Sequence, residues 1–196
     1  MKIAEIFYSI QGEGLLAGMP SVFVRTSGCN LHCWFCDTDF TSWHPEGESL
    51  RVEEVLARVE AFAVKHVVVT GGEPMIAPGL ADLCQGLRRH GHHVTLETAG
   101  TVFEAVACDL ASLSPKLSSS TPHQREGGRL AACHDRLRLR PDVICAFMEH
   151  CDYQLKFVID RPSDLPEVLA LLDHLPPVNP SRVLLMPQGV TADEVK

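Results

Sequence analysis

The sequence predicts an α/β fold, an open, partial TIM-like barrel of about six mainly parallel strands with few helices. Strand-like and helix-like stretches alternate along the chain, which is typical of parallel strands joined by right-handed crossovers. The chain has 196 residues, whereas a complete eight-stranded barrel needs about 250. Residues able to do chemistry follow directly after predicted strands, where the active sites of such folds lie. We therefore expect one domain over residues 1–196, with an incomplete barrel and an active site at one edge.

Six short runs rich in β-branched, aromatic and aliphatic residues predict the strands. They cover residues 21–26, 66–70, 92–98, 109–113, 152–160 and 182–186. Apolar residues at helical spacing predict four helices, at 49–63, 79–90, 141–149 and 163–174. Ser49 is the expected N-cap of the first helix.

Between residues 118 and 140 the apolar pattern gives way to a polar excursion. Serines, paired glycines and five arginines dominate it, so we expect a surface segment with little regular structure. The arginines indicate a solvated face rather than a nucleic-acid patch.

The composition is that of an ordinary globular protein, with 45% hydrophobic and 21% charged residues. A formal net charge of −8 argues against nucleic acid as a partner. No signal peptide and no apolar run long enough to span a bilayer is present, so we expect no membrane partner and a place in the reducing cytoplasm. In that compartment, clustered cysteines usually indicate a metal or catalysis.

The strongest motif is formed by Cys29, Cys33 and Cys36, three cysteines within eight residues. An iron–sulfur cube normally has one thiolate on each of its four irons, so three ligands would leave one iron open for a substrate or cofactor. A structural zinc site made by these cysteines with His32 or His44 fits the spacing equally well. The spacing alone does not decide between the two.

Further candidate groups lie at turns and strand ends. Gln11-Gly12-Glu13-Gly14 would bring backbone and a carboxylate close to a ligand, and Arg25 could grip a carboxylate with two hydrogen bonds. Asp37-Thr38-Asp39 offers the oxygen ligands that suit magnesium. Gly71-Gly72-Glu73-Pro74 could hold an ammonium group, and Lys116 could meet a ligand carboxylate. Each of these motifs alone is also compatible with an ordinary turn or a solvated side chain.

Taken together, these motifs resemble those of the radical S-adenosylmethionine (SAM) superfamily, and within it the 7-carboxy-7-deazaguanine synthase family. The Cys-x3-Cys-x2-Cys loop followed by Gly-Gly-Glu-Pro is specific for the superfamily. The family resemblance runs in order over nearly the whole chain, and it rests on the stretches 9–14, 23–25, 36–38, 97–100 and 114–116. The last strand departs from the family pattern, because it reads Met186-Pro187-Gln188 where Gln-Pro is expected.

The resemblance implies a radical SAM core and a role for each matched residue. Cys29, Cys33 and Cys36 would hold a [4Fe–4S] cluster, and Thr38 would bind Mg²⁺. The residues implied for SAM are Phe35, Cys36, Asp37, Gly71, Gly72, Glu73, Gly100, Ser114, Pro115, Lys116, Met186, Pro187, Gln188 and Gly189. The residues implied for the substrate, 6-carboxy-5,6,7,8-tetrahydropterin, are Ile10, Gln11, Gly12, Glu13, Arg25 and Thr98.

The resemblance also implies a reaction and its partners. A reduced cluster would cleave SAM to a 5′-deoxyadenosyl radical, which removes a hydrogen from the pterin. The ring would then contract with loss of ammonia to give 7-carboxy-7-deazaguanine, a precursor in queuosine biosynthesis. An electron donor such as flavodoxin or ferredoxin and a homodimeric state are implied as well. The alternatives are an activase of a glycyl-radical enzyme, which shares the cysteine spacing, and a zinc-binding interaction module.

Overall fold

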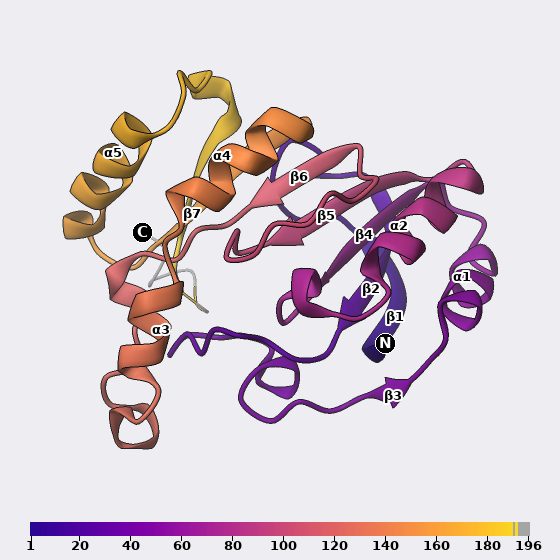
Figure 1. The fold of residues 1–196 in the computed structure, drawn as a ribbon, viewed down its shortest axis with the longest axis horizontal. Helices are drawn as coiled ribbons and strands as arrows, with labels where there is room; N and C mark the ends of the chain where they lie inside the picture. Colours follow the sequence, from indigo (N-terminus) through magenta and orange to yellow (C-terminus); the bar gives the residue numbers. More distant parts are fainter. Residues whose placement is uncertain (190, 192–196) are drawn as a thin grey trace.

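The computed structural model describes residues 1–189 and 191, and its central feature is an eight-stranded sheet (Figure 1). The strands lie in the order β3-β1-β2-β4-β5-β6-β7-β8. β1 is antiparallel to both of its neighbours, and the six strands from β2 to β8 in this order are parallel. The bounds are Lys2–Ile10 (β1), Pro20–Thr26 (β2), Glu48–Ser49 (β3), His66–Gly71 (β4), His93–Thr98 (β5), Leu110–Leu113 (β6), Tyr153–Ile159 (β7) and Val183–Pro187 (β8).

The sheet is open, as expected for a partial barrel. Among the described residues β3 and β8 are its two edges, and no pairing joins them. The helices are Val52–Glu60 (α1), Leu80–Arg89 (α2), Ala131–Leu137 (α3), Pro141–His150 (α4) and Leu165–His174 (α5). In the part of the chain that the structure describes, no helix is long and apolar enough to cross a membrane.

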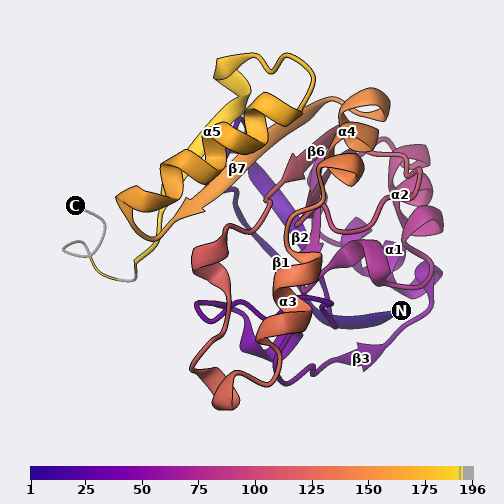
Figure 2. The same ribbon diagram turned by 60° about the vertical axis from the view of Figure 1, so that its left-hand side comes forward.

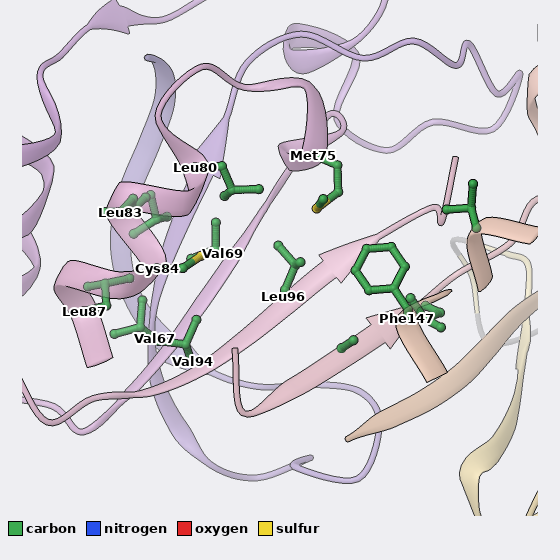
Figure 3. Packing of buried hydrophobic residues seen from close by; sticks show 14 of the residues in the cluster. Val67, Val69, Met75, Leu80, Leu83, Cys84, Leu87, Val94, Leu96 and Phe147 are labelled. Atoms are coloured by element: carbon green, nitrogen blue, oxygen red, sulfur yellow. The ribbon is translucent and has the colours of Figure 1, made fainter. Parts of the chain in front are cut away.

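The hydrophobic core lies between the outer face of the sheet and the helices. Figure 3 shows Val69 of β4 and Leu96 of β5 facing the apolar side of α2, which presents Leu83, Cys84 and Leu87. All five side chains are fully buried. Val22–Val24 in β2 and Val67–Val69 in β4 are buried on both faces of the sheet, and these apolar runs are the pattern that predicted the two strands.

The opposite face of the sheet carries a polar row. The strand register pairs Arg25 with Thr70, Glu97 with Ser112, and Ser112 with Gln154. Side chains alternate between the two faces of a strand, so this row lies on the face turned away from α2. The chain thus folds with an apolar outer layer and a polar interior that can bind a ligand.

The six predicted strands are confirmed, with small differences at their ends. β1 and β3 were not predicted: β1 is mostly exposed or half-buried, so its alternation is weak, and β3 has two residues. The prediction for Ser49 was wrong, because Ser49 lies in β3 and α1 begins at Val52 with Arg51 as its N-cap. The Arg51 backbone N–H donates to the Glu54 carboxylate at 2.8 Å, which satisfies this helix end without a serine.

The polar excursion is more ordered than expected. It contains α3, and Figures 1 and 2 show this helix beside the segment that follows β2. Arg138 and Arg125 are also less solvated than predicted, with side chains 15% and 27% exposed. Arg138 joins α3 to α5 through Glu167 at 2.5 Å, and its Nη1 donates to the Lys116 carbonyl at 3.1 Å.

Candidate active site

A cavity of about 570 Å³ lies where the parallel strands end. It is lined by most of the residues that the sequence predicted for the site. These are Gln11, Gly12, Glu13, Arg25, Cys29, Cys33, Phe35, Cys36, Asp37, Thr38, Gly71, Gly72, Thr98, Ser114, Lys116, Met186, Pro187, Gln188 and Gly189. Segments far apart in the sequence therefore meet at one place, because parallel strands bring their carboxyl ends to the same edge.

Four predicted site residues do not line this cavity: Ile10, Glu73, Gly100 and Pro115. Ile10 is 60% exposed at the end of β1. Glu73 and Gly100 are buried behind the cavity wall. Their proposed contacts with ligands therefore have to be made through backbone groups or indirectly.

The three cysteines sit in the loop that follows β2. Cys33 is buried, and Cys29 and Cys36 are half-buried. The backbone N–H of Leu31 donates to Cys29 Sγ at 3.3 Å, and Ser42 Oγ donates to Cys36 Sγ at 3.2 Å. Hydrogen bonds to sulfur stabilise a thiolate, so the loop supplies donors that a metal-bound sulfur would use.

Burial controls the protonation of two of these thiols. It raises the pKa of Cys29 to about 12, and the nearby Glu73 carboxylate adds to this effect. It raises the pKa of Cys33 to about 11, although the Lys116 ammonium acts in the opposite direction. Both residues are therefore thiols at neutral pH in the absence of a metal, and binding of iron would release their protons.

The donor set fits an iron–sulfur cluster better than a zinc ion. All three cysteines are free and line the same cavity. Among the described residues, no group of three or more His, Cys, Asp or Glu side chains is arranged to hold a single metal ion, as the zinc alternative requires. A cluster instead places each thiolate on a different iron, so the sulfur atoms need not surround one point.

The Gly71–Gly72 pair lets β4 approach the cysteine loop closely. Gly71 has φ +137, and a Cβ on Gly72 would lie 2.2 Å from the Gly28 carbonyl oxygen. The Gly72 backbone N–H donates to the Thr26 carbonyl at 3.2 Å, and that of Glu73 donates to the Gly28 carbonyl at 2.9 Å. These glycines are needed because the two backbones touch here.

Glu73 connects two strand ends through its buried side chain. Its carboxylate is fully buried and accepts hydrogen bonds from Thr98 Oγ1 at 2.7 Å and from the backbone N–H groups of Met75 and Ala99 at 3.0 and 2.8 Å. Burial raises the pKa of this carboxyl, and the hydrogen bonds partly oppose the shift. Glu73 thus ties the end of β4 to the end of β5 directly behind the cavity.

Lys116 is a half-buried cation that lines the cavity. Its Nζ donates to the carbonyl and to Oγ of Ser114, both at 2.7 Å. Burial lowers the pKa of this ammonium, while Cys33 and Cys29 raise it when they are thiolates. An anionic ligand in the cavity would relieve the cost of burying this charge.

A second group of polar side chains lies on the sheet interior. Gln11 Nε2 donates to Glu97 Oε1 at 3.0 Å, and Thr70 Oγ1 donates to Glu97 Oε2 at 2.8 Å. Glu13 forms an ion pair with Lys156, and Arg25 pairs with Glu5 at 3.0 Å. The cavity therefore offers acceptors and cations for a polar heterocycle that carries a carboxylate.

Glu97 and Lys156 line the cavity and were missed by the sequence analysis. Lys156 lies between the buried Leu155 and Phe157 in β7 and therefore on the opposite face, and a charge at such a position is a usable signal. Glu97 precedes Thr98 at the end of β5, so it could have been found from its place next to a predicted site residue.

The comparisons with known proteins agree with this geometry. Residues 23–119 match the model of the Radical SAM superfamily. This is the class of enzyme to which the open, mainly parallel barrel and the three clustered cysteines point. The chain is 48% identical to the 7-carboxy-7-deazaguanine synthase of Rhodopirellula baltica, over 100% of this chain and 76% of the relative. The identity to that of Halobacterium salinarum is 45%, over 100% and 80%. The crystal structure of QueE from Escherichia coli has a TM-score of 0.72 at 26% identity, and the match covers 98% of this chain and 85% of that one.

The chain therefore belongs to the 7-carboxy-7-deazaguanine synthase family of radical SAM enzymes. Members of the superfamily use a [4Fe–4S] cluster and SAM, which the sequence analysis had expected. Neither the activase nor the zinc module is supported.

Proposed function

We propose that this chain, as one domain over residues 1–196, contracts the ring of 6-carboxy-5,6,7,8-tetrahydropterin to give 7-carboxy-7-deazaguanine and ammonia. The product and ammonia together contain all atoms of the substrate, so this carbon–nitrogen lyase reaction consumes no net oxidant. The observation that carries the proposal is that the cysteine loop and the polar interior of the sheet line the same cavity.

Cys29, Cys33 and Cys36 are the proposed cluster ligands. When bound, the cluster supplies the electron that cleaves SAM and so starts radical chemistry on the substrate. The protein's part is to hold SAM and substrate in contact and to exclude water. Cys33 is buried, which supports the exclusion of water.

SAM is proposed to lie between the cysteine loop and the ends of β4, β6 and β8. Lys116 supports this placement, because an ammonium that lines the cavity suits the carboxylate of the methionine part. Glu73, Gly100 and Pro115 would act from behind the wall, through backbone groups or through their neighbours. The side chains or backbone groups that would face SAM belong to Phe35, Cys36, Asp37, Gly71, Gly72, Ser114, Lys116, Met186, Pro187, Gln188 and Gly189.

The tetrahydropterin is proposed to lie over the polar interior of the sheet. Arg25 and Lys156 are the cations that suit its carboxylate. Gln11 and Glu97 offer an amide and a carboxylate for the N–H groups and the carbonyl of the ring. Gly12, Glu13 and Thr98 would complete this side, and Ile10 would contribute only its backbone.

Mg²⁺ is proposed to bind at Thr38, beside the cluster ligands. The Thr38 hydroxyl oxygen lies 3.7 Å from Cys36 Sγ, which places it next to the cysteine loop. Asp37 and Thr38 both line the cavity and offer hard oxygen atoms. When bound, the ion would supply positive charge for the oxygen atoms of the substrate.

Two protein partners are also proposed. The electron donor, such as a flavodoxin or ferredoxin, would approach where the cysteine loop reaches the surface at Trp34, whose side chain is 41% exposed. A second copy of the chain would cover Tyr8 and Ile10, which are 52% and 60% exposed near the end of β1, beyond the residues that pair with β3. No nucleic acid is part of this proposal.

The substrate assignment can be tested with Arg25→Gln in the anaerobically reconstituted enzyme. Loss of charged hydrogen bonds of about 1.5–3 kcal/mol should raise KM for the tetrahydropterin on the order of tenfold to a hundredfold. Affinity for SAM should not change. Arg58→Gln is the matched control, because Arg58 forms an exposed ion pair with Glu48 at 2.9 Å outside the cavity. An unchanged KM, or a loss of SAM affinity, would contradict the assignment.

A further inference from the structure

The segment 118–138 packs directly on the cysteine loop. The backbone N–H of Trp34 donates to the Ser120 carbonyl at 3.1 Å, and Trp34 Nε1 donates to the Ser119 carbonyl at 2.7 Å. Trp34 follows Cys33 in the sequence, so these bonds attach the middle of the loop to a segment about 85 residues away. Figures 1 and 2 show the same proximity of α3 to this part of the chain.

His134 makes the most informative contact in this interface. Its ring is 1% exposed, and Nδ1 accepts a hydrogen bond from the backbone N–H of His32 at 3.1 Å. On the other side, Nε2 lies 2.9 Å from Ser120 Oγ. The Ser120 hydroxyl donates to the Leu117 carbonyl at 2.6 Å, so it is free to accept from Nε2–H. One tautomer, with the proton on Nε2, satisfies every group in this chain of hydrogen bonds.

Arg125 fixes the other end of the loop. Its guanidinium pairs with Asp39 at 2.5 Å and lies 4.0 Å from the centre of the Trp43 ring. Trp43 Nε1 in turn donates to the Cys33 carbonyl at 3.0 Å. The backbone next to Cys33 is thus held on one side by His134 and on the other by Trp43, against which Arg125 packs.

We propose that His134 is a positioning residue of the cluster site, acting as the buried hydrogen-bond acceptor that holds the His32 amide and with it the Cys29–Cys36 loop. The inference builds on the proposed role of the three cysteines as cluster ligands. Loop residues 30–34 belong to no strand or helix, so their shape depends on contacts from outside the loop. Groups behind a metal ligand orient it, and His134 does so through the backbone rather than through a ligand side chain.

The test measures loss of the cluster and does not depend on turnover. Parent, His134→Leu and His134→Asn proteins are reconstituted anaerobically, and the decay of cluster absorbance is followed in excess iron chelator. The Leu variant should lose its cluster about tenfold faster than the parent, because it cannot accept the His32 N–H. The Asn variant should decay within about twofold of the parent, because its side-chain carbonyl can replace the Nδ1 acceptor.

Cys133→Ser is the matched control, because Cys133 is the exposed neighbour of His134 on α3. It should leave the decay rate unchanged. Equal decay of the Leu variant and the parent, or equally fast decay of the Leu and Asn variants, would overturn the proposal. The second outcome would indicate a packing role only.

If His134→Leu does not fold, Ser120→Ala replaces it. This variant removes the partner of Nε2 and should also decay faster than the parent, whereas an unchanged rate would overturn the proposal. Failure of the parent to assemble a cluster would count against the proposed function instead, so the two failures can be told apart.

Discussion

Acid should destabilise the apoprotein through His134, and a His134→Asn substitution should remove this sensitivity. Burial lowers the pKa of His134 to about 4, and the nearby Asp135 carboxylate opposes this only in part. An unfolded histidine titrates near pH 6.5. Protonating Nδ1 would also set a new N–H against the donating amide of His32.

The sign and size of the effect follow from these two pKa values. Because the folded state binds the proton more weakly than the unfolded state, stability is highest above about pH 6.5 and falls as the pH approaches 4. Between pH 7 and pH 5 the contribution of this one residue amounts to a loss of about 2 kcal/mol in the free energy of unfolding. Asparagine has no proton to gain in this range, so its variant should not show this loss.

The assay is equilibrium unfolding of the apoprotein in urea at a series of pH values, under reducing conditions. The quantity compared is the pH dependence of the unfolding free energy, since the substitution can also change its value at pH 7. His174→Asn, at the exposed end of α5, serves as the control and should follow the parent curve. If His134→Asn and the parent lose the same free energy between pH 7 and pH 5, the buried, neutral state of His134 is refuted.

Two further predictions concern the cavity wall and the metal. Gly72→Ala should reduce the iron bound per chain and lower the melting temperature, because the added Cβ would lie 2.2 Å from the Gly28 carbonyl oxygen. Such overpacking costs about 1–3 kcal/mol in stability. Iron analysis measures the first effect, and thermal unfolding measures the second. Thr38→Val should raise the Mg²⁺ concentration needed for half-maximal product formation, whereas Thr38→Ser should restore it, since serine keeps the hydroxyl. An unchanged Mg²⁺ titration for the valine variant would remove Thr38 from the metal site.

The fold was predictable because β2 and β4 contain apolar runs that are buried on both faces and are followed by chemically distinctive residues. Val67–Val69 leads directly into Gly71–Gly72, and Ser21–Thr26 leads into the cysteine loop. β1 escaped prediction because most of its residues are exposed or half-buried, so neither a continuous apolar run nor a clean alternation appears. Ser49 was a reasonable cap by residue type, but Ser49 pairs with β1 as part of β3, and the N-cap lies two residues further on, at Arg51.

The site was predictable where residues follow a strand and less so where they lie within one. Lys156 and Glu97 reach the cavity from the interior of the sheet, and only the register shows that they share a face. The contact of His134 with the His32 amide joins residues 102 positions apart. No local pattern in a polar, arginine-rich segment indicates such a contact, because it depends on how the excursion folds back over the cysteine loop.

The central claim is that Cys29, Cys33 and Cys36 hold a [4Fe–4S] cluster with one iron left open for SAM. Electron paramagnetic resonance of the reduced, reconstituted protein tests it most directly. We predict about four irons per chain and a cluster signal that changes when SAM is added, because SAM would occupy the open iron. A cluster signal that SAM leaves unchanged would contradict the claim.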